Sequence, residues 1–106
     1  MLTAQSEITY NHPPAVLASR LSAYLKVNAG KWAISIDEEV PYKLCYEGNV
    51  DPSSPYSIDI ESDEKEMLER VLIRLSKALA TNEIHHQITL YEFKSGSDIA
   101  VFRYPE

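Results

Sequence analysis

Glycine is scarce in this chain, which contains only Gly30, Gly48 and Gly96. The nearest pair, Gly30 and Gly48, is 18 positions apart. Phosphate-binding P-loops and dinucleotide-binding turns need two or three glycines within about eight residues, because their backbone must approach the phosphates closely. The G-x-S-x-G elbow of serine hydrolases needs two glycines about four positions apart. The sequence therefore excludes all three kinds of site.

Cysteine is also nearly absent, since Cys45 is the only one and no intramolecular disulfide can form. Cys45 lies between Leu44 and Tyr46 on an expected strand, with no basic neighbour or helix N-terminus to activate its thiol. We therefore interpret Cys45 as a small hydrophobic residue rather than a nucleophile.

Long apolar segments are missing as well. No uncharged apolar run approaches the roughly 18 residues that a membrane-spanning helix needs. Residues 1–7 lack the basic region and apolar run of a signal peptide. With a single cysteine, this composition favours an intracellular, most simply cytoplasmic, protein.

Basic residues are outnumbered, with 10 lysines and arginines against 16 acidic residues and a net charge of −6. An acidic body repels phosphate backbones and anionic lipids, so direct binding to nucleic acid or to a membrane is disfavoured. Arg70, Arg74 and Lys77 recur at helical spacing, and we expect them to form a solvated helix face. Residues 14–81 share the order α-β-β-β-α with double-stranded-RNA-binding domains, but this segment lacks the basic face that those domains use.

No catalytic, metal-binding or cofactor-binding residues are predicted. His85 and His86 follow Glu83, but adjacent histidines on a strand point to opposite faces. His12 and Cys45 lie far away in the sequence and do not complete a zinc-binding pattern. The carboxylates lie in expected turns, on polar strand positions and at a helix start, where they are solvated, whereas acid–base catalysis needs a desolvated carboxylate.

Apolar residues in alternation predict strands, and apolar residues at helical spacing predict helices. The predicted strands cover residues 7–10, 31–36, 42–46, 56–61, 88–93 and 99–104, and the predicted helices cover residues 14–28 and 64–81. The order is β-α-β-β-(β)-α-β-β in a single domain of residues 1–106. We therefore expect an α+β fold with two helices packed on one face of a mainly antiparallel sheet. A ferredoxin-like plan with an added hairpin is the nearest named arrangement.

Single residues mark the expected ends of the helices. Gly30 is expected to cap the first helix in a left-handed conformation. Asp63 and Glu66 have the spacing of a capping box at the start of the second helix. Glu66 and Arg70 form an i,i+4 pair in the favourable order on that helix.

The positions of two strands within the sheet also follow from the sequence. Pro41 has no N–H to donate, so strand 42–46 is expected to lie at an edge or to begin after the proline. As an edge it could pair with a second copy of the chain, so homo-oligomerisation stays open. Segment 99–104 is apolar on both faces and is expected in the middle of a sheet or between two layers.

Aromatic residues are present mainly as tyrosine, with seven tyrosines against two phenylalanines. Tyrosine combines an apolar ring with a polar hydroxyl and is enriched at protein interfaces. Tyr56 follows the Pro-rich loop 47–55 directly, and we expect it to be the most exposed tyrosine. Trp32 alternates with Ile34 and Ile36 and is expected on the buried face of its strand.

These observations favour a small acidic domain that regulates or binds a protein partner and is not an enzyme. A specific form is an inhibitor or immunity-type protein whose carboxylates meet a basic site. The expected partner-binding residues are two acidic segments and the tyrosine between them, namely Asp37, Glu38, Glu39, Tyr56, Asp59, Glu61 and Asp63. The alternative is a small enzyme or ligand-sensing domain with a pocket between the sheet and the helices, because the fold alone does not exclude it.

Overall fold

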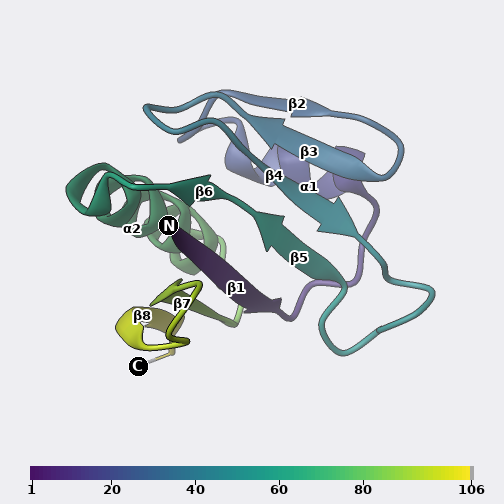
Figure 1. Cartoon of the computed structure of the whole chain (residues 1–106). Helices are drawn as coiled ribbons and strands as arrows, with labels where there is room; N and C mark the ends of the chain where they lie inside the picture. Colours follow the sequence, from purple (N-terminus) through teal and green to yellow (C-terminus); the bar gives the residue numbers. More distant parts are fainter. Residues whose placement is uncertain (106) are drawn as a thin grey trace.

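The protein has an α+β fold with two helices and two antiparallel four-stranded sheets (Figure 1). The computed structural model describes residues 1–105. One sheet has the strand order β6-β1-β7-β8 and the other has the order β2-β3-β4-β5. The elements in chain order are β1 (Leu2–Ile8), α1 (Pro14–Leu21), β2 (Val27–Ala29), β3 (Ala33–Ile36), β4 (Tyr42–Tyr46), β5 (Tyr56–Asp59), β6 (Glu61–Ser62), α2 (Lys65–Thr81), β7 (His86–Glu92) and β8 (Asp98–Tyr104).

A seam between β1 and β5 joins the two sheets. β1 pairs with β6 through Leu2 opposite Ser62, and continuing that antiparallel register places Ser6 opposite Ile58. There the Ser6 hydroxyl donates to the Tyr56 carbonyl at 3.1 Å and accepts the Ile58 N–H at 3.0 Å. The Thr3 hydroxyl also donates to the Ile60 carbonyl at 2.7 Å. Side chains of β1 thus take the place of the missing ladder bonds, and the two sheets follow one another as a single bent layer.

Across this seam, four strands are neighbours in the same order as in a ferredoxin-like plan. With β5 and β6 counted as one interrupted strand, the neighbours run β4, β5–β6, β1 and β7. α1 comes between β1 and the parallel strand β4, and α2 comes between β6 and the parallel strand β7, so each crossover passes one intervening strand. The β2–β3 hairpin is an insertion after α1, and β8 is an addition after β7.

A single hydrophobic core lies between the bent layer and the helices, which lie on one side of the strands (Figure 1). The predicted apolar stripe of α2 is confirmed, since Leu68, Leu72 and Leu75 are fully buried. α1 contacts the β2-β3-β4-β5 sheet, and its residues Leu17 and Leu21 are buried in the same core. Neither helix is long and apolar enough to cross a membrane in the part of the chain that the structure describes.

The first helix is shorter than predicted. α1 ends at Leu21, and the chain then turns through bonds from the Tyr24 and Leu25 N–H groups to the Leu21 carbonyl. Leu25 is still buried, so helical spacing of apolar residues continues past the end of the helix. The prediction that residues 22–28 are helical was wrong because residues 27–29 gain ladder bonds to β3 instead.

The predicted caps were also wrong. Gly30 does not have a positive φ and donates its N–H to the Ala33 carbonyl in the β2–β3 turn. At α2 the N-cap residue is Glu64, which makes no side-chain capping bond, so the Asp63 and Glu66 capping box does not form. Instead the Ser62 hydroxyl accepts the Glu64 N–H at 3.0 Å.

The first strand begins earlier than predicted, at Leu2 rather than Glu7. Ala4 and Ile8 face the core on this strand, and Ser6 faces β5. The small Ala4 and the polar Ser6 occupy two of the inward positions, so the apolar alternation is too weak to identify the strand from the sequence.

Two predicted strand positions are corrected by the topology. β4 begins after Pro41, which confirms one of the two expected alternatives, but it lies between β3 and β5 and is not the edge that could pair with a second copy. β8 pairs with β7 alone in its sheet, so it is an edge strand rather than a mid-sheet one, and its apolar residues are only partly buried. Trp32 is 58% exposed and lies before β3 rather than on its buried face.

Candidate binding groove

A groove of about 810 Å³ crosses the outer face of the β2-β3-β4-β5 sheet at one end of its strands. The strands place two rows of exposed side chains along it. One row consists of Asn28, Ser35, Lys43 and Asp59, and the other consists of Lys26, Asp37, Pro41 and Glu61.

Antiparallel register produces these rows. Asn28 lies opposite Ser35, Ser35 lies opposite Lys43, and Lys43 lies opposite Asp59. Asp37 lies two residues after Ser35, just past the end of β3, and its N–H donates to the Lys26 carbonyl at 2.9 Å, which places Asp37 and Lys26 side by side in the second row. Residues two apart on a strand point to the same face and lie about 6.6 Å apart, and four strands span about 14 Å.

The residues between the two rows point toward the core. Ile36, Tyr42 and Ile60 are at most 3% exposed. Because these side chains point inward, the floor of the groove consists mainly of their backbone, and the two outward rows form its walls. The groove therefore runs across the strands rather than along them.

The walls carry charges of both signs. Lys43 is adjacent to Asp59, Lys26 is adjacent to Asp37, and Glu61 has no basic neighbour in the groove. None of these five side chains takes part in the ion pairs found within residues 1–105. Asp59 and Glu61 thus form an acidic end of the groove that is free to meet a cation.

The structure brings together three of the predicted binding residues, Asp37, Asp59 and Glu61. The sequence identified these three residues as acidic, but it did not predict that they lie in one groove. The opposing lysines, Lys26 and Lys43, were missed because their place in the groove depends on the pairing register, which hydrophobic alternation does not reveal.

Glu38 and Glu39 point to α2 rather than into the groove. Glu39 Oε2 accepts bonds from Arg70 Nε at 3.2 Å and from Arg70 Nη2 at 2.9 Å. Glu38 Oε1 forms an ion pair with Arg74 Nη2 at 3.2 Å, but the geometry is not that of a hydrogen bond. The face of α2 with Arg70 and Arg74, predicted to be only solvated, therefore holds the 37–39 turn.

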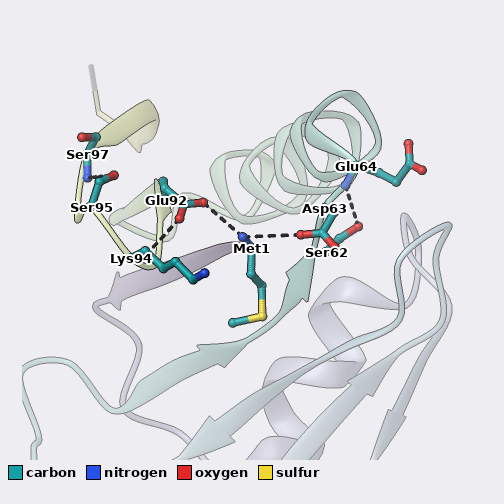
Figure 2. Close-up of polar contacts among 8 residues, drawn as sticks. All are labelled: Met1, Ser62, Asp63, Glu64, Glu92, Lys94, Ser95 and Ser97. Atoms are coloured by element: carbon teal, nitrogen blue, oxygen red, sulfur yellow. Dashed lines mark hydrogen bonds and ion pairs between the residues drawn. The ribbon is translucent and has the colours of Figure 1, made fainter.

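Asp63 lies outside the groove, at the start of α2 (Figure 2). Its Oδ1 is 3.4 Å from the Met1 amino group, which is also 3.2 Å from Glu92 Oε2. Glu92 accepts the Lys94 N–H at 3.0 Å, and this bond holds the pKa of Glu92 below its usual range. The bond to the Met1 amino group lowers the pKa of Glu92 further. Asp63 thus belongs to an exposed contact between the chain start and the β7–β8 turn.

Tyr56 is fully buried, and the prediction that it would be the most exposed tyrosine was wrong. Its hydroxyl donates to the His12 carbonyl at 2.6 Å, and burial raises the pKa of the phenol. Its ring lies 5.0 Å from that of Tyr46, whose hydroxyl donates to Asn11 Oδ1 at 2.7 Å. Tyr56 therefore anchors the end of loop 47–55 and cannot contact a partner.

Tyr42 lies beneath the groove with a hydroxyl that has no hydrogen-bond partner in residues 1–105. Burial raises the pKa of this phenol, and the negative charge of Glu38 raises it further. Tyr42 therefore stays neutral and supports the groove through its ring.

Two further side chains with reactive chemistry, His86 and Cys45, lie outside the groove. His86 is 5% exposed, and its Nδ1–H donates to the Ile84 carbonyl at 2.9 Å. Its Nε2 accepts the Ser76 hydroxyl at 2.7 Å, so both ring nitrogens are occupied. Cys45 is partly exposed and lies between Ala33 and Ser57. No group of three metal-ligating side chains gathers within residues 1–105.

Comparison of the chain with known protein families, with curated proteins and with solved structures finds no match, so the groove itself is the basis for any functional assignment.

Proposed function

We propose that this protein is a small binding or regulatory domain that receives a basic segment of a protein partner in the groove. The observation that carries the proposal is the acidic end formed by Asp59 and Glu61. These exposed carboxylates lie on either side of the buried Ile60, and residues two apart in extended chain are about 6.6 Å apart, which suits a lysine or arginine placed between them.

The other end of the groove supports a protein rather than a single cation as the occupant. Lys26 and Asn28 lie about 14 Å across the strands from the acidic end, a span of about four extended residues. An extended segment with a basic side chain at one end and an acidic or polar one at the other matches both ends. An inhibitor or immunity-type protein that covers the basic site of another protein is one form of this activity.

Binding is favoured over catalysis because the charged side chains of the groove are all exposed, and its one buried ionisable group, the Tyr42 phenol, stays neutral. Acid–base chemistry generally needs at least one desolvated group with a perturbed affinity for protons. The net charge of −6 also favours a basic protein surface over nucleic acid as the partner.

The test is affinity capture from the native cell with the protein and two charge-matched variants. The groove variant combines Asp59→Asn with Glu61→Gln, and the control combines Glu64→Gln with Glu66→Gln on the exposed start of α2. The partner should be retained by the original protein and by the control, and the groove variant should bind it at least about tenfold more weakly. The association rate should fall as salt rises. Equal binding of the groove variant and the control would contradict the proposal.

A second candidate function is the binding of a small zwitterionic molecule, favoured by the volume of about 810 Å³. Pockets for small molecules occupy about 300–1,000 Å³. This groove lies on the outer face of the sheet rather than between the sheet and the helices, where the sequence-based alternative placed a pocket. A ligand screen by thermal shift separates the two functions, since a small molecule should raise the melting temperature of the original protein but not that of the groove variant.

A further inference from the structure

The edge of β8 is a second surface that is independent of the groove. β8 pairs only with β7, and its other edge is open along seven residues, Asp98–Tyr104. A strand edge presents unpaired N–H and C=O groups to any chain that can pair with it. Natural edges are protected by shortness, lysine, proline, bulges or covering elements.

The other strand edges in residues 1–105 are protected. β2 has only three residues and β6 only two. The edge of β5 at the seam is bonded by the Ser6 hydroxyl. β8 has none of these protections between Ala100 and Arg103, because its register shift lies at Ile99 and its proline follows the strand.

Apolar side chains surround this open edge. Val101 is 40% exposed at the centre of the strand, and Ile73 of α2 is 38% exposed beside it. Both line a cavity of about 500 Å³ together with Phe102 and Arg103. Val101 and Phe102 are consecutive and point to opposite faces of the strand. The edge of β8 therefore borders this cavity beside α2, and apolar side chains lie on both faces of the strand.

The sequence of β8 is complementary to itself in an antiparallel arrangement. With a two-fold axis at Val101, Ala100 of each copy lies opposite Phe102 of the other, so a small side chain faces a large one. In the same register Asp98 lies opposite Tyr104 of the other copy, one position from Arg103, so the acidic start of each strand comes near the basic residue at the end of the other. Parallel pairing would instead place like charges side by side.

We infer that a second copy of this chain pairs with β8 across a two-fold axis, so that the two β6-β1-β7-β8 sheets join into one continuous sheet. Such an isologous contact closes on itself and produces a dimer rather than a fibre. The groove lies on the other sheet and remains open in each copy.

The test compares Val101→Lys with Val50→Lys, because Val50 is 84% exposed in loop 47–55 and the chemical change is the same. In Val101→Lys, the introduced lysine of each copy would face its equivalent across the axis, where like charges oppose pairing. Sedimentation velocity should show the original protein and Val50→Lys moving from 12.0 kDa toward twice that mass as concentration rises. Val101→Lys should dimerise at least about tenfold more weakly.

A monomer at every concentration for the original protein, or equal dimerisation of Val101→Lys, would overturn the inference. Circular dichroism checks the fold of each variant. If Val101→Lys does not fold, amide exchange in the original protein decides, since β8 amides should become more protected with rising concentration and unchanged protection contradicts pairing. The groove variant should dimerise normally, so this result is distinct from the test of the proposed function.

Discussion

His86 illustrates how a residue with reactive chemistry can serve only the fold. The imidazole is enclosed between α2 and β7, and its two nitrogens are bonded to Ser76 and Ile84. Burial lowers the pKa of His86, because a charged ring would lose its solvation and Nε2 would lose its role as acceptor. The neutral ring thus connects the second helix to the start of the second-last strand.

This neutral state gives the stability of the protein a defined pH dependence. Below about pH 6.5 a histidine in the unfolded chain takes up a proton, whereas folded His86 stays neutral until the pH falls through its lowered pKa. In that window the unfolded state binds more protons, so the free energy of unfolding decreases as the pH falls, by at most about 1.4 kcal/mol per pH unit.

Substitution of His86 isolates this contribution. At pH 8, His86→Gln should lower the free energy of unfolding by about 1–3 kcal/mol because buried polar groups lose their partners. The deficit should shrink as the pH falls below about 6.5, since the original protein alone loses the stabilisation of the neutral ring. Urea titrations at several pH values measure the difference, with the exposed neighbour His85→Gln as control. A deficit that is constant with pH would show that His86 is not held neutral.

The burial of a side chain was predictable where it belongs to a regular apolar pattern along its own strand or helix. Ile34, Ile36 and the leucines of α2 are buried as their periodicity predicts. Trp32 and Tyr56 reverse the expectation because their positions depend on where a strand ends and on distant residues. Tyr56 is buried by its contact with the His12 carbonyl, 44 positions away, and no local pattern carries that information.

At the scale of elements, the break between β5 and β6 determines both the seam and the groove. Ile60 separates the two strands, and the chain leaves β4 at this point to pair with β1. Asp59 and Glu61 lie on either side of the break and form the acidic end of the groove. From the side of β1, the Thr3 hydroxyl bonds to Ile60 at the break, and the Ser6 hydroxyl bonds to Tyr56 and Ile58 next to it.

Removal of the Ser6 hydroxyl should therefore have a larger effect than the loss of a surface serine. Ser6→Ala leaves the Ile58 N–H and the Tyr56 carbonyl without their bonds to Ser6, and we expect a loss of about 1–3 kcal/mol in the free energy of unfolding. Ser57→Ala, at an exposed position of β5, should change it by less than about 0.5 kcal/mol. Urea denaturation measures both, and similar losses would show that the seam does not depend on Ser6.

Elements whose pattern is long and local were predictable from the sequence. The second helix, predicted over 64–81, is observed over Lys65–Thr81, and the predicted strand 42–46 is observed as β4. The end of α1 was not predictable, because Leu25 continues the helical spacing while Val27 and Asn28 gain partners in β3. The acidic residues of the groove were identified, but its walls require a register between four strands, and the binding role itself stays a prediction.

At the scale of the whole molecule, the two sheets share one core. Buried side chains from β3, β4 and α1 belong to the same cluster as those from β1, β7 and α2. Tyr56 and Ile58 of one sheet and Ala4 and Ile8 of the other belong to this cluster on the two sides of the seam. Because a break at the seam would expose apolar surface on both sides, we expect the two sheets to unfold together.

A small cavity in one sheet tests this cooperativity from the other. Ile88 of β7 is fully buried, and Ile88→Val should cost about 0.5–1.5 kcal/mol. Trp32 is the only tryptophan and lies beside β3 in the other sheet, so its fluorescence reports on that sheet alone. In urea titrations the fluorescence midpoint should move to lower urea by the same amount as the midpoint from far-ultraviolet circular dichroism, which mainly follows the helices. A fluorescence midpoint that does not move would show that the sheets unfold separately, and the seam would then be a boundary between two units rather than part of one core.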